Sequence, residues 1–168
     1  MGRRVWLGCC IVALLAVSGL VAEAQQAVFV VRHAERQDDS QDSALSEAGV
    51  RRAELLASLL KDAGITAIYV SDLQRTIKTA EPLAKALKIE MKRVAQYEDK
   101  DMDTLVAALR SRHAQDRVLI VGHSNTMPAL MKGLGDPDGL KLGRDEYNLL
   151  LLLVPRGDAR PAVLRLRF

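Results

Sequence analysis

The alternation of short apolar runs with helical patterns is the feature of this sequence that most constrains its fold. Three apolar runs are rich in β-branched residues and are followed by turn signals, so each predicts a β-strand. We expect three further strands: one from a short run, one from a leucine-rich run, and one from a C-terminal run in which apolar and charged residues alternate. The six predicted strands cover residues 27–32, 66–70, 91–94, 117–122, 148–154 and 161–168. Strands and helices in alternation predict a three-layer α/β/α sandwich with a mostly parallel central sheet.

Two predicted helices lie in the first half of the chain. Ser46 is expected to cap the first of them, and Gly64 is expected to end it. The second helix is expected over residues 76–87, where Pro82 shortens the regular part because proline removes a backbone hydrogen bond. The apolar residues that recur at helical spacing in the first helix, and should face the core, are Val50, Ala53, Leu56 and Leu60.

Two further helices are predicted in the second half of the chain. Asp101 or Asp103 is expected to cap the third helix, which runs to His113. The fourth is expected to begin near Asn125, with Pro128 tolerated in its first turn.

The N-terminal residues have the pattern of a secretory leader. Two arginines precede an uncharged, mostly apolar run over residues 5–22, and a small-x-small pattern ends at Ala24. We expect a signal peptide over residues 1–24, cleaved after Ala24, and one domain over residues 25–168 that is periplasmic or secreted and free of the membrane. The alternative is an uncleaved anchor, since the apolar run is just long enough to cross a bilayer.

Composition excludes several classes of function. Both cysteines, Cys9 and Cys10, lie in the leader, so the predicted domain cannot hold a disulfide scaffold, a cysteine zinc site or a cysteine nucleophile. The 24 basic and 21 acidic residues are interspersed, and only 4% of residues are aromatic, which argues against a nucleic-acid partner. We expect no metal and no cofactor.

Cationic and hydrogen-bonding side chains follow three of the predicted strands directly. Because ligands bind beyond the carboxyl ends of strands in open parallel sheets, these side chains are expected to meet at one edge. Each alone has an ordinary explanation, since a histidine at a strand end is often a surface residue and Ser124 could cap a helix. Together, two arginines, two histidines and two helix N-termini describe a pocket for an anion such as phosphate. The residues are Arg32, His33, Ser71, Arg75, His123 and Ser124.

These residues lie in segments that resemble the histidine phosphatase superfamily, in its small branch without a cap domain. The segments follow one another in the family's order across nearly the whole predicted domain, with Ala34 where many relatives carry glycine. The resemblance implies a phosphoglycerate mutase-like fold and metal-independent hydrolysis of small phosphomonoesters through a phosphohistidine. The matching segments are 31–35, 45–49, 71–76, 79–80 and 121–125.

The resemblance also implies a role for each residue of the pocket. His33 would be the nucleophile, which requires a neutral ring, and two adjacent arginines would lower its pKa. Arg32 and Arg75 would grip the phosphate oxygens, together with Ser124. His123 would bind one oxygen and donate a hydrogen bond to it as charge develops.

The acid that protonates the leaving group is harder to assign. Family members usually carry it in the loop after the third strand, where Glu98 matches best. Asp99 and Asp101 compete with it, and Asp101 could instead cap a helix. Glu146 is a further candidate.

Other functions stay open at this point. A non-catalytic phosphate-binding module would keep Arg32, Arg75 and His123 without a working acid. His33 and Glu35 also form the H-x-E pattern of zinc deaminases, but the cysteine ligands of those enzymes are missing. A phosphomutase is disfavoured because a small open pocket excludes water poorly. A protein phosphohistidine phosphatase fits the small build, but export would separate it from cytoplasmic partners. The physiological substrate and the oligomeric state cannot be read from the sequence.

Overall fold

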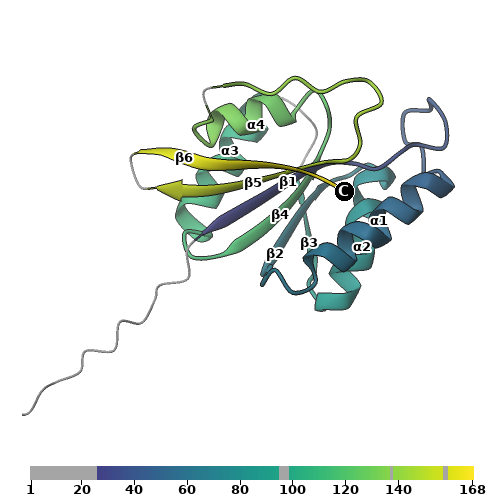
Figure 1. Ribbon diagram of the computed structural model, residues 1–168, viewed down its shortest axis with the longest axis horizontal. Coiled ribbons are helices and arrows are strands. Elements are labelled where there is room, and N and C mark those ends of the chain that lie inside the picture. Colours follow the sequence, from purple (N-terminus) through teal and green to yellow (C-terminus); the bar gives the residue numbers. More distant parts are fainter. Residues whose placement is uncertain (1–25, 95–98, 137, 157–158) are drawn as a thin grey trace, which may run out of the picture.

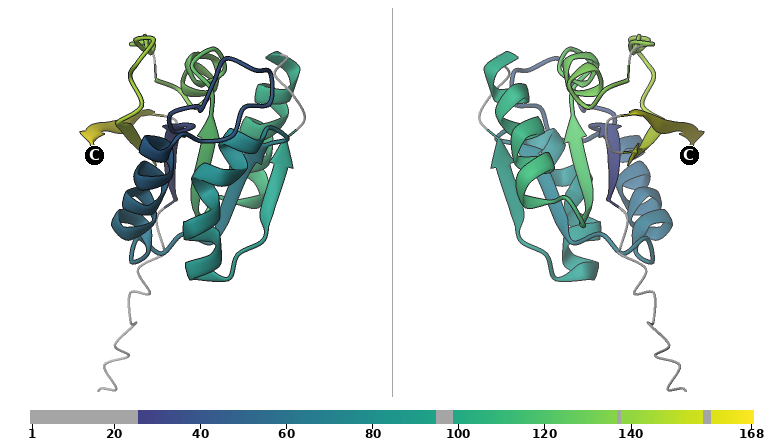
Figure 2. Two further views of the ribbon diagram at one scale, coloured as in Figure 1. Left: turned by 90° about the vertical axis from the view of Figure 1, so that its right-hand side faces the viewer. Right: turned by 90° about the vertical axis from the view of Figure 1, so that its left-hand side faces the viewer.

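The computed structural model describes residues 26–94, 99–136, 138–156 and 159–168. A six-stranded sheet forms the middle layer, with two helices on each face (Figures 1 and 2). This arrangement confirms the predicted three-layer α/β/α sandwich. The predicted leader, residues 1–24, lies outside the described residues. Among the residues described, no helix is long and apolar enough to cross a membrane.

All six predicted strands are present, and the sheet is mostly parallel. The strands are β1 (Ala27–Arg32), β2 (Ala67–Ser71), β3 (Met91–Val94), β4 (Arg117–Gly122), β5 (Leu149–Arg156) and β6 (Ala159–Arg167). They lie in the order β3-β2-β4-β1-β5-β6. The first four in this order are parallel, whereas β5 pairs antiparallel with β1, and β6 pairs antiparallel with β5 at the edge of the sheet.

Each face of the sheet carries its own hydrophobic core. The helices are α1 (Glu47–Leu60), α2 (Gln74–Leu87), α3 (Asp99–Arg112) and α4 (Met127–Gly133). Along β1, Val28 and Val30 pack towards α3 and α4, whereas Phe29 and Val31 pack towards α1 and α2. Alternation along the strand sends successive side chains to opposite faces, so β1 is buried along its whole length.

Helix α1 begins where predicted and buries Ala53, Leu56 and Leu60 as expected, but Val50 lies outside its buried face. The Ser46 hydroxyl caps it by accepting a hydrogen bond from the Gly49 amide (3.1 Å). Val50 was expected in the core but is 47% exposed. The reason is a close approach at Gly49, where a Cβ would lie 2.3 Å from the Glu35 carbonyl oxygen. Because the helix packs against the loop after β1 through this glycine, Val50 points to solvent.

The end of α1 and the course of α2 also differ from expectation. Gly64 does not end α1 but lies in the turn that follows, with φ of +70°. Helix α2 begins at Gln74 and continues through Pro82 without a break. Ala80 and Leu83 on either side of the proline are fully buried, and such packing supplies most of the stability of a protein helix.

The last two helices begin at other residues than predicted. Helix α3 begins at Asp99, before both Asp101 and Asp103. Helix α4 begins at Met127 rather than near Asn125, and Thr126 is its N-cap residue. The start of α4 lies within the usual uncertainty of a helix end, about two residues, whereas α3 begins well before either predicted cap.

Candidate active site

The carboxyl ends of β1 and β4 bring the two predicted histidines together. Arg32 is paired with Gly122 in the register of the two strands, and the His33 amide donates to the Gly122 carbonyl (2.9 Å). The rings of His33 and His123 have centroids 5.1 Å apart. Both histidines are 4% exposed and Arg32 is 7% exposed. The predicted convergence of side chains at one sheet edge is therefore present, and it is buried.

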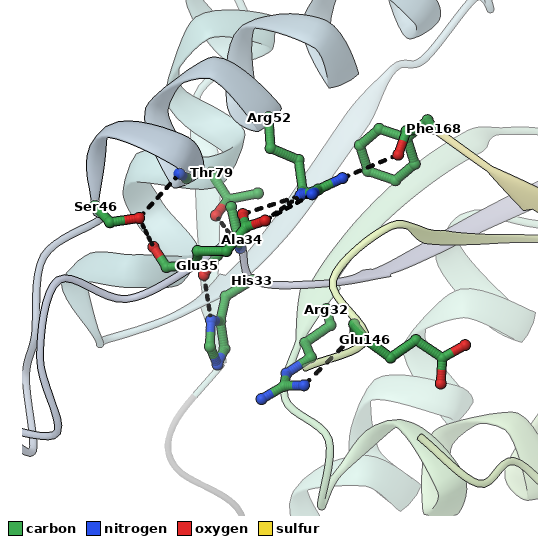
Figure 3. Close-up of polar contacts among 10 residues, drawn as sticks. Arg32, His33, Ala34, Glu35, Ser46, Arg52, Thr79, Glu146 and Phe168 are labelled. Atoms are coloured by element: carbon green, nitrogen blue, oxygen red, sulfur yellow. Dashed lines mark hydrogen bonds and ion pairs between the residues drawn. The ribbon is translucent and has the colours of Figure 1, made fainter. Parts of the chain in front are cut away.

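The ring of His33 is oriented by its own neighbour in the chain. Its Nδ1 lies 2.8 Å from the Ala34 carbonyl oxygen (Figure 3). A carbonyl can only accept, so Nδ1 carries the proton and Nε2 keeps its lone pair. The Ala34 peptide is itself held, because its amide donates to the Thr79 hydroxyl (2.9 Å), which donates to the Arg75 carbonyl (2.6 Å). Helix α2 thus fixes the orientation of His33 through Thr79.

Burial and positive charge keep His33 neutral. Burial is the largest cause and, together with Arg75, Arg32 and Arg36, lowers the pKa of His33 to about 4, against the raising effect of the Ala34 hydrogen bond. The sequence predicted the direction from the arginines, but the loss of solvent contributes more than they do. At neutral pH the Nε2 lone pair of His33 is available for attack.

The ring of His123 has a side-chain partner at each nitrogen. An Arg75 guanidinium nitrogen lies 3.3 Å from Nδ1, and the Ser71 hydroxyl lies 3.1 Å from Nε2. Burial, followed by the contributions of His33, Arg75 and Arg32, lowers the pKa of His123 to about 2. His123 is therefore neutral as well, and the site holds two neutral imidazoles beside two guanidinium groups.

Arg32 binds the loop that carries Glu146, which the sequence connected with the site only through that residue's carboxylate. One of its terminal nitrogens donates to the carbonyls of Gly143 (3.2 Å) and Arg144 (2.7 Å) and, at 3.4 Å, of Glu146. The guanidinium carbon lies 4.1 Å from the centroid of the Tyr147 ring. These contacts orient the side chain, while its Nε is buried and has no hydrogen-bond partner among the described residues.

Arg75 is placed by the loop that follows β1. One of its terminal nitrogens donates to the Gln41 carbonyl (2.8 Å). In the same loop, the Asp42 carboxylate accepts from the amide of Gln74 (2.7 Å) at the start of α2. The loop therefore covers the beginning of α2 and holds Arg75 beside His123.

The remaining predicted site residues fall into three groups. Ser124 is half-buried in the turn between His123 and α4, next to the site. Glu98, the first choice for the acid, lies outside the described residues and stays a prediction. Asp99 and Asp101 lie in the first turn of α3.

Glu146 is held away from the reacting centre. Its carboxylate accepts from the Gly143 amide (2.9 Å) and forms an ion pair with Arg167. Figure 3 shows it pointing away from His33. These contacts lower the pKa of Glu146, so the carboxyl group is ionised more readily and is a poor proton donor to a leaving group. They favour a structural role, in which Glu146 shapes the loop whose carbonyls hold Arg32.

Sequence reasoning missed the supporting roles of three residues. Thr79 lay in a matching segment but had no assigned task, and Ser71 was placed at the sheet edge without its link to His123. Tyr147, whose ring centroid is 5.9 Å from that of His33, was missed altogether. The available signal for it was a lone aromatic residue in a polar loop.

Comparisons with known proteins show what this chain is similar to. Residues 28–105 match the histidine phosphatase superfamily (branch 1). A probable phosphoglycerate mutase of Proteus mirabilis (strain HI4320) is 39% identical over 85 residues, which is 46% of this chain and 40% of that protein. A probable phosphoglycerate mutase of Yersinia pestis (strain Pestoides F) is 41% identical over 71 residues, 38% of this chain and 33% of that protein. The chain thus matches less than half the length of these curated relatives.

Solved structures share the fold at low sequence identity. The protein histidine phosphatase SixA, complexed with tungstate, has a TM-score of 0.66 and 18% identity, over 84% of this chain and 96% of that one. A phosphoserine phosphatase of Entamoeba histolytica has a TM-score of 0.66 and 14% identity, over 82% and 94%. A mycobacterial glucosyl-3-phosphoglycerate phosphatase has a TM-score of 0.64 and 16% identity, over 83% and 96%. Residues 28–105 thus match the histidine phosphatase superfamily (branch 1), and the motifs and the fold of the chain agree with that match.

Proposed function

We propose that this protein is an exported, metal-independent phosphatase that hydrolyses small phosphomonoesters through a phosphohistidine at His33. The observation that carries the proposal is the state of the His33 ring. Its Nδ1 is held by the Ala34 carbonyl, so Nε2 presents a lone pair, and burial among cationic side chains keeps the ring from being protonated.

Three groups around His33 suit a phosphoryl group. The buried Nε of Arg32 is a donor without a partner among the described residues, and leaving such a group unpaired is costly. Arg75 and His123 lie in contact with each other, and the ring centroid of His123 is 5.1 Å from that of His33. Charge on three phosphoryl oxygens is best neutralised by several donors that are already in place. We propose Ser124 as a further donor.

The reaction then has two steps. His33 Nε2 attacks phosphorus as the bond from phosphorus to the ester oxygen breaks, and an acid protonates the departing oxygen. Water then attacks phosphorus and gives a proton to the carboxylate that the acid became in the first step, the bond to Nε2 breaks, and inorganic phosphate leaves. We propose Glu98 as the acid, because the resemblance favours it and because Glu146 is committed to other contacts.

Hydrolysis of para-nitrophenyl phosphate in the presence of a chelator tests this proposal. We expect turnover by the wild-type protein and a loss of at least ~10³-fold in His33→Ala. Turnover that the chelator removed would contradict metal independence, and turnover that survived in His33→Ala would contradict the covalent step. Vanadate binding without turnover of any ester would favour a phosphate-binding module.

Relatives named as probable phosphoglycerate mutases make phosphoryl transfer the second candidate. In a mutase, a second hydroxyl replaces water as the acceptor in the second step. Interconversion of phosphoglycerates should be measured beside the release of inorganic phosphate. We expect release of phosphate to dominate, and interconversion without release would assign a mutase.

Export belongs to the same proposal. We propose that residues 1–24 direct the chain out of the cytoplasm and are removed after Ala24. Fractionation of cells that express the whole chain, followed by N-terminal sequencing, tests this. We expect soluble exported protein that begins at Gln25, whereas an intact N-terminus in the membrane fraction would indicate an anchor.

A further inference from the structure

The two ring nitrogens of His123 contact partners of different hydrogen-bonding character. A guanidinium carries only N–H donors, so the contact with Arg75 requires Nδ1 to accept. The proton of the neutral ring is then on Nε2, where it donates to the Ser71 hydroxyl (3.1 Å). Ser71 is a hydroxyl and not a carbonyl, so it is able to donate as well as accept.

The surroundings of Ser71 permit both directions. The Leu73 amide donates to the Ser71 hydroxyl (3.2 Å), and the Thr76 hydroxyl lies 2.7 Å from it. When Ser71 accepts from His123, it donates to Thr76, which donates to the Leu73 carbonyl (2.9 Å). When Ser71 donates to Nε2 instead, Thr76 keeps its bond to the Leu73 carbonyl. Rotation of the Ser71 hydroxyl therefore converts one arrangement into the other, and every donor proton has an acceptor in both.

We propose that Ser71 is a positioning residue that allows His123 to change tautomer when a phosphoryl group binds. This inference rests on the proposed function. While Arg75 donates to Nδ1, the ring carries its proton on Nε2. When Arg75 donates to a phosphoryl oxygen, Nδ1 takes the proton and donates to a second oxygen. By exchange with water, one proton leaves Nε2 and another is added to Nδ1, so the ring of His123 stays neutral. The Ser71 hydroxyl then rotates and donates its own proton to Nε2.

A neutral ring with a movable proton fits the electrostatics of the site. His123 must be a donor if it is to stabilise a phosphoryl oxygen, and the tautomer defined by Arg75 offers no N–H there. Burial and neighbouring cations oppose a second proton on the ring. A tautomer change supplies the donor without adding charge.

Side-chain ¹⁵N spectra of the histidines test the proposal directly. The chain has three histidines, so His33→Gln and His113→Gln assign the signals by elimination. We expect His123 to show its proton on Nε2 without ligand and on Nδ1 with vanadate, while His33 keeps its proton on Nδ1. A His123 ring with the same tautomer in both states, or with a second proton when vanadate binds, would overturn the proposal.

Substitutions at Ser71 separate positioning from folding. In Ser71→Ala we expect vanadate to leave the His123 tautomer unchanged and kcat to fall about 10- to 100-fold, as for other groups that orient a histidine. Ser71→Thr, which keeps a hydroxyl, should restore both. Ser111→Ala removes a hydroxyl from the exposed side of α3 and serves as the matched control. Wild-type spectra decide the question even if Ser71→Ala does not fold.

The outcomes distinguish this inference from the proposed function. Turnover that depends on His33, together with a His123 tautomer insensitive to vanadate, would overturn the role of Ser71 and leave the phosphatase proposal intact. The same conclusion would follow if Ser71→Ala kept wild-type kcat and the wild-type tautomer change. Absence of both turnover and vanadate binding would overturn both proposals.

Discussion

His33 and His123 are neighbours with equal burial, yet they are held in opposite ways. His33 is anchored by the Ala34 carbonyl, which only accepts, and His123 is anchored by the Ser71 hydroxyl, which accepts or donates. A nucleophile needs one lone pair at one constant position, so a single tautomer suits it. A group that stabilises developing charge needs a proton to donate. The partner that anchors each ring, and not the histidine itself, therefore sets which ring nitrogen carries the proton.

Removing either imidazole ring should have the largest effect on activity. His33→Ala is expected to lose at least ~10³-fold in kcat and to form no phosphohistidine. His123→Ala should lose about 10²- to 10³-fold, the usual cost of one donor to developing charge, and should still become labelled on His33. Rapid quench with a ³²P-labelled ester measures both quantities. Labelling of His33→Ala on His123 would reverse the assignment.

Loosening the anchor of His33 should have the next largest effect. Thr79→Val keeps the shape of the side chain but removes the hydroxyl that holds the Ala34 peptide. We expect kcat to fall about 10- to 100-fold, with recovery in Thr79→Ser. Steady-state kinetics of the three proteins check this. Equal kcat in wild type and Thr79→Val would show that the Ala34 peptide needs no support from α2.

A decrease in pH should destabilise the folded protein, because the imidazole rings of both His33 and His123 resist protonation in the folded state. In the unfolded chain each takes up a proton near pH 6.5, whereas in the folded chain His33 does so near 4 and His123 near 2. Below pH 6.5 the unfolded chain therefore binds more protons, and the free energy of unfolding falls as the pH decreases from 6.5 to 4. The slope is up to about 1.4 kcal/mol per pH unit for each ring.

Urea unfolding between pH 7 and pH 4 measures this slope. His33→Ala should have a shallower slope than wild type, because one of the two rings is gone, whatever its stability at pH 7. An unchanged slope would mean that His33 already binds a proton in the folded protein.

Substitution of Tyr147 should have the smallest effect on activity, because Tyr147 contacts Arg32 and neither of the groups that hydrogen-bond to the rings of His33 and His123. Tyr147→Leu removes an aromatic face from the guanidinium, a contact of about 0.5–2 kcal/mol. We expect KM to rise a few-fold with little change in kcat, and Tyr147→Phe to behave like wild type. Substrate titrations measure the shift. A fall in kcat for Tyr147→Phe would assign a role to the hydroxyl group.

Much of the fold and of the site was predictable because it depends on local patterns. The bounds of β1 and β4 coincide with predicted apolar runs and those of β3 with a predicted short run, since alternation and β-branching act within a few residues. The sequence also predicted that Arg32, His33 and His123 lie close together, because the carboxyl ends of parallel strands lie at the same edge of a sheet. Val50 was misplaced because the face that a helix buries depends on how closely it approaches its neighbour, and only Gly49 allows the approach seen here.

The layers of the sandwich, the strands that end at the site and the kinds of side chain found there follow from patterns in the amino-acid sequence. Which atom of each ring contacts which partner follows from the packing of the folded chain. His123 contacts Arg75 and Ser71 across 48 and 52 residues of chain, and Arg32 contacts Arg144 across 112. A hydrogen bond weakens steeply with small changes in distance and angle, so such contacts depend on how whole segments pack. No local pattern in the sequence carries that information.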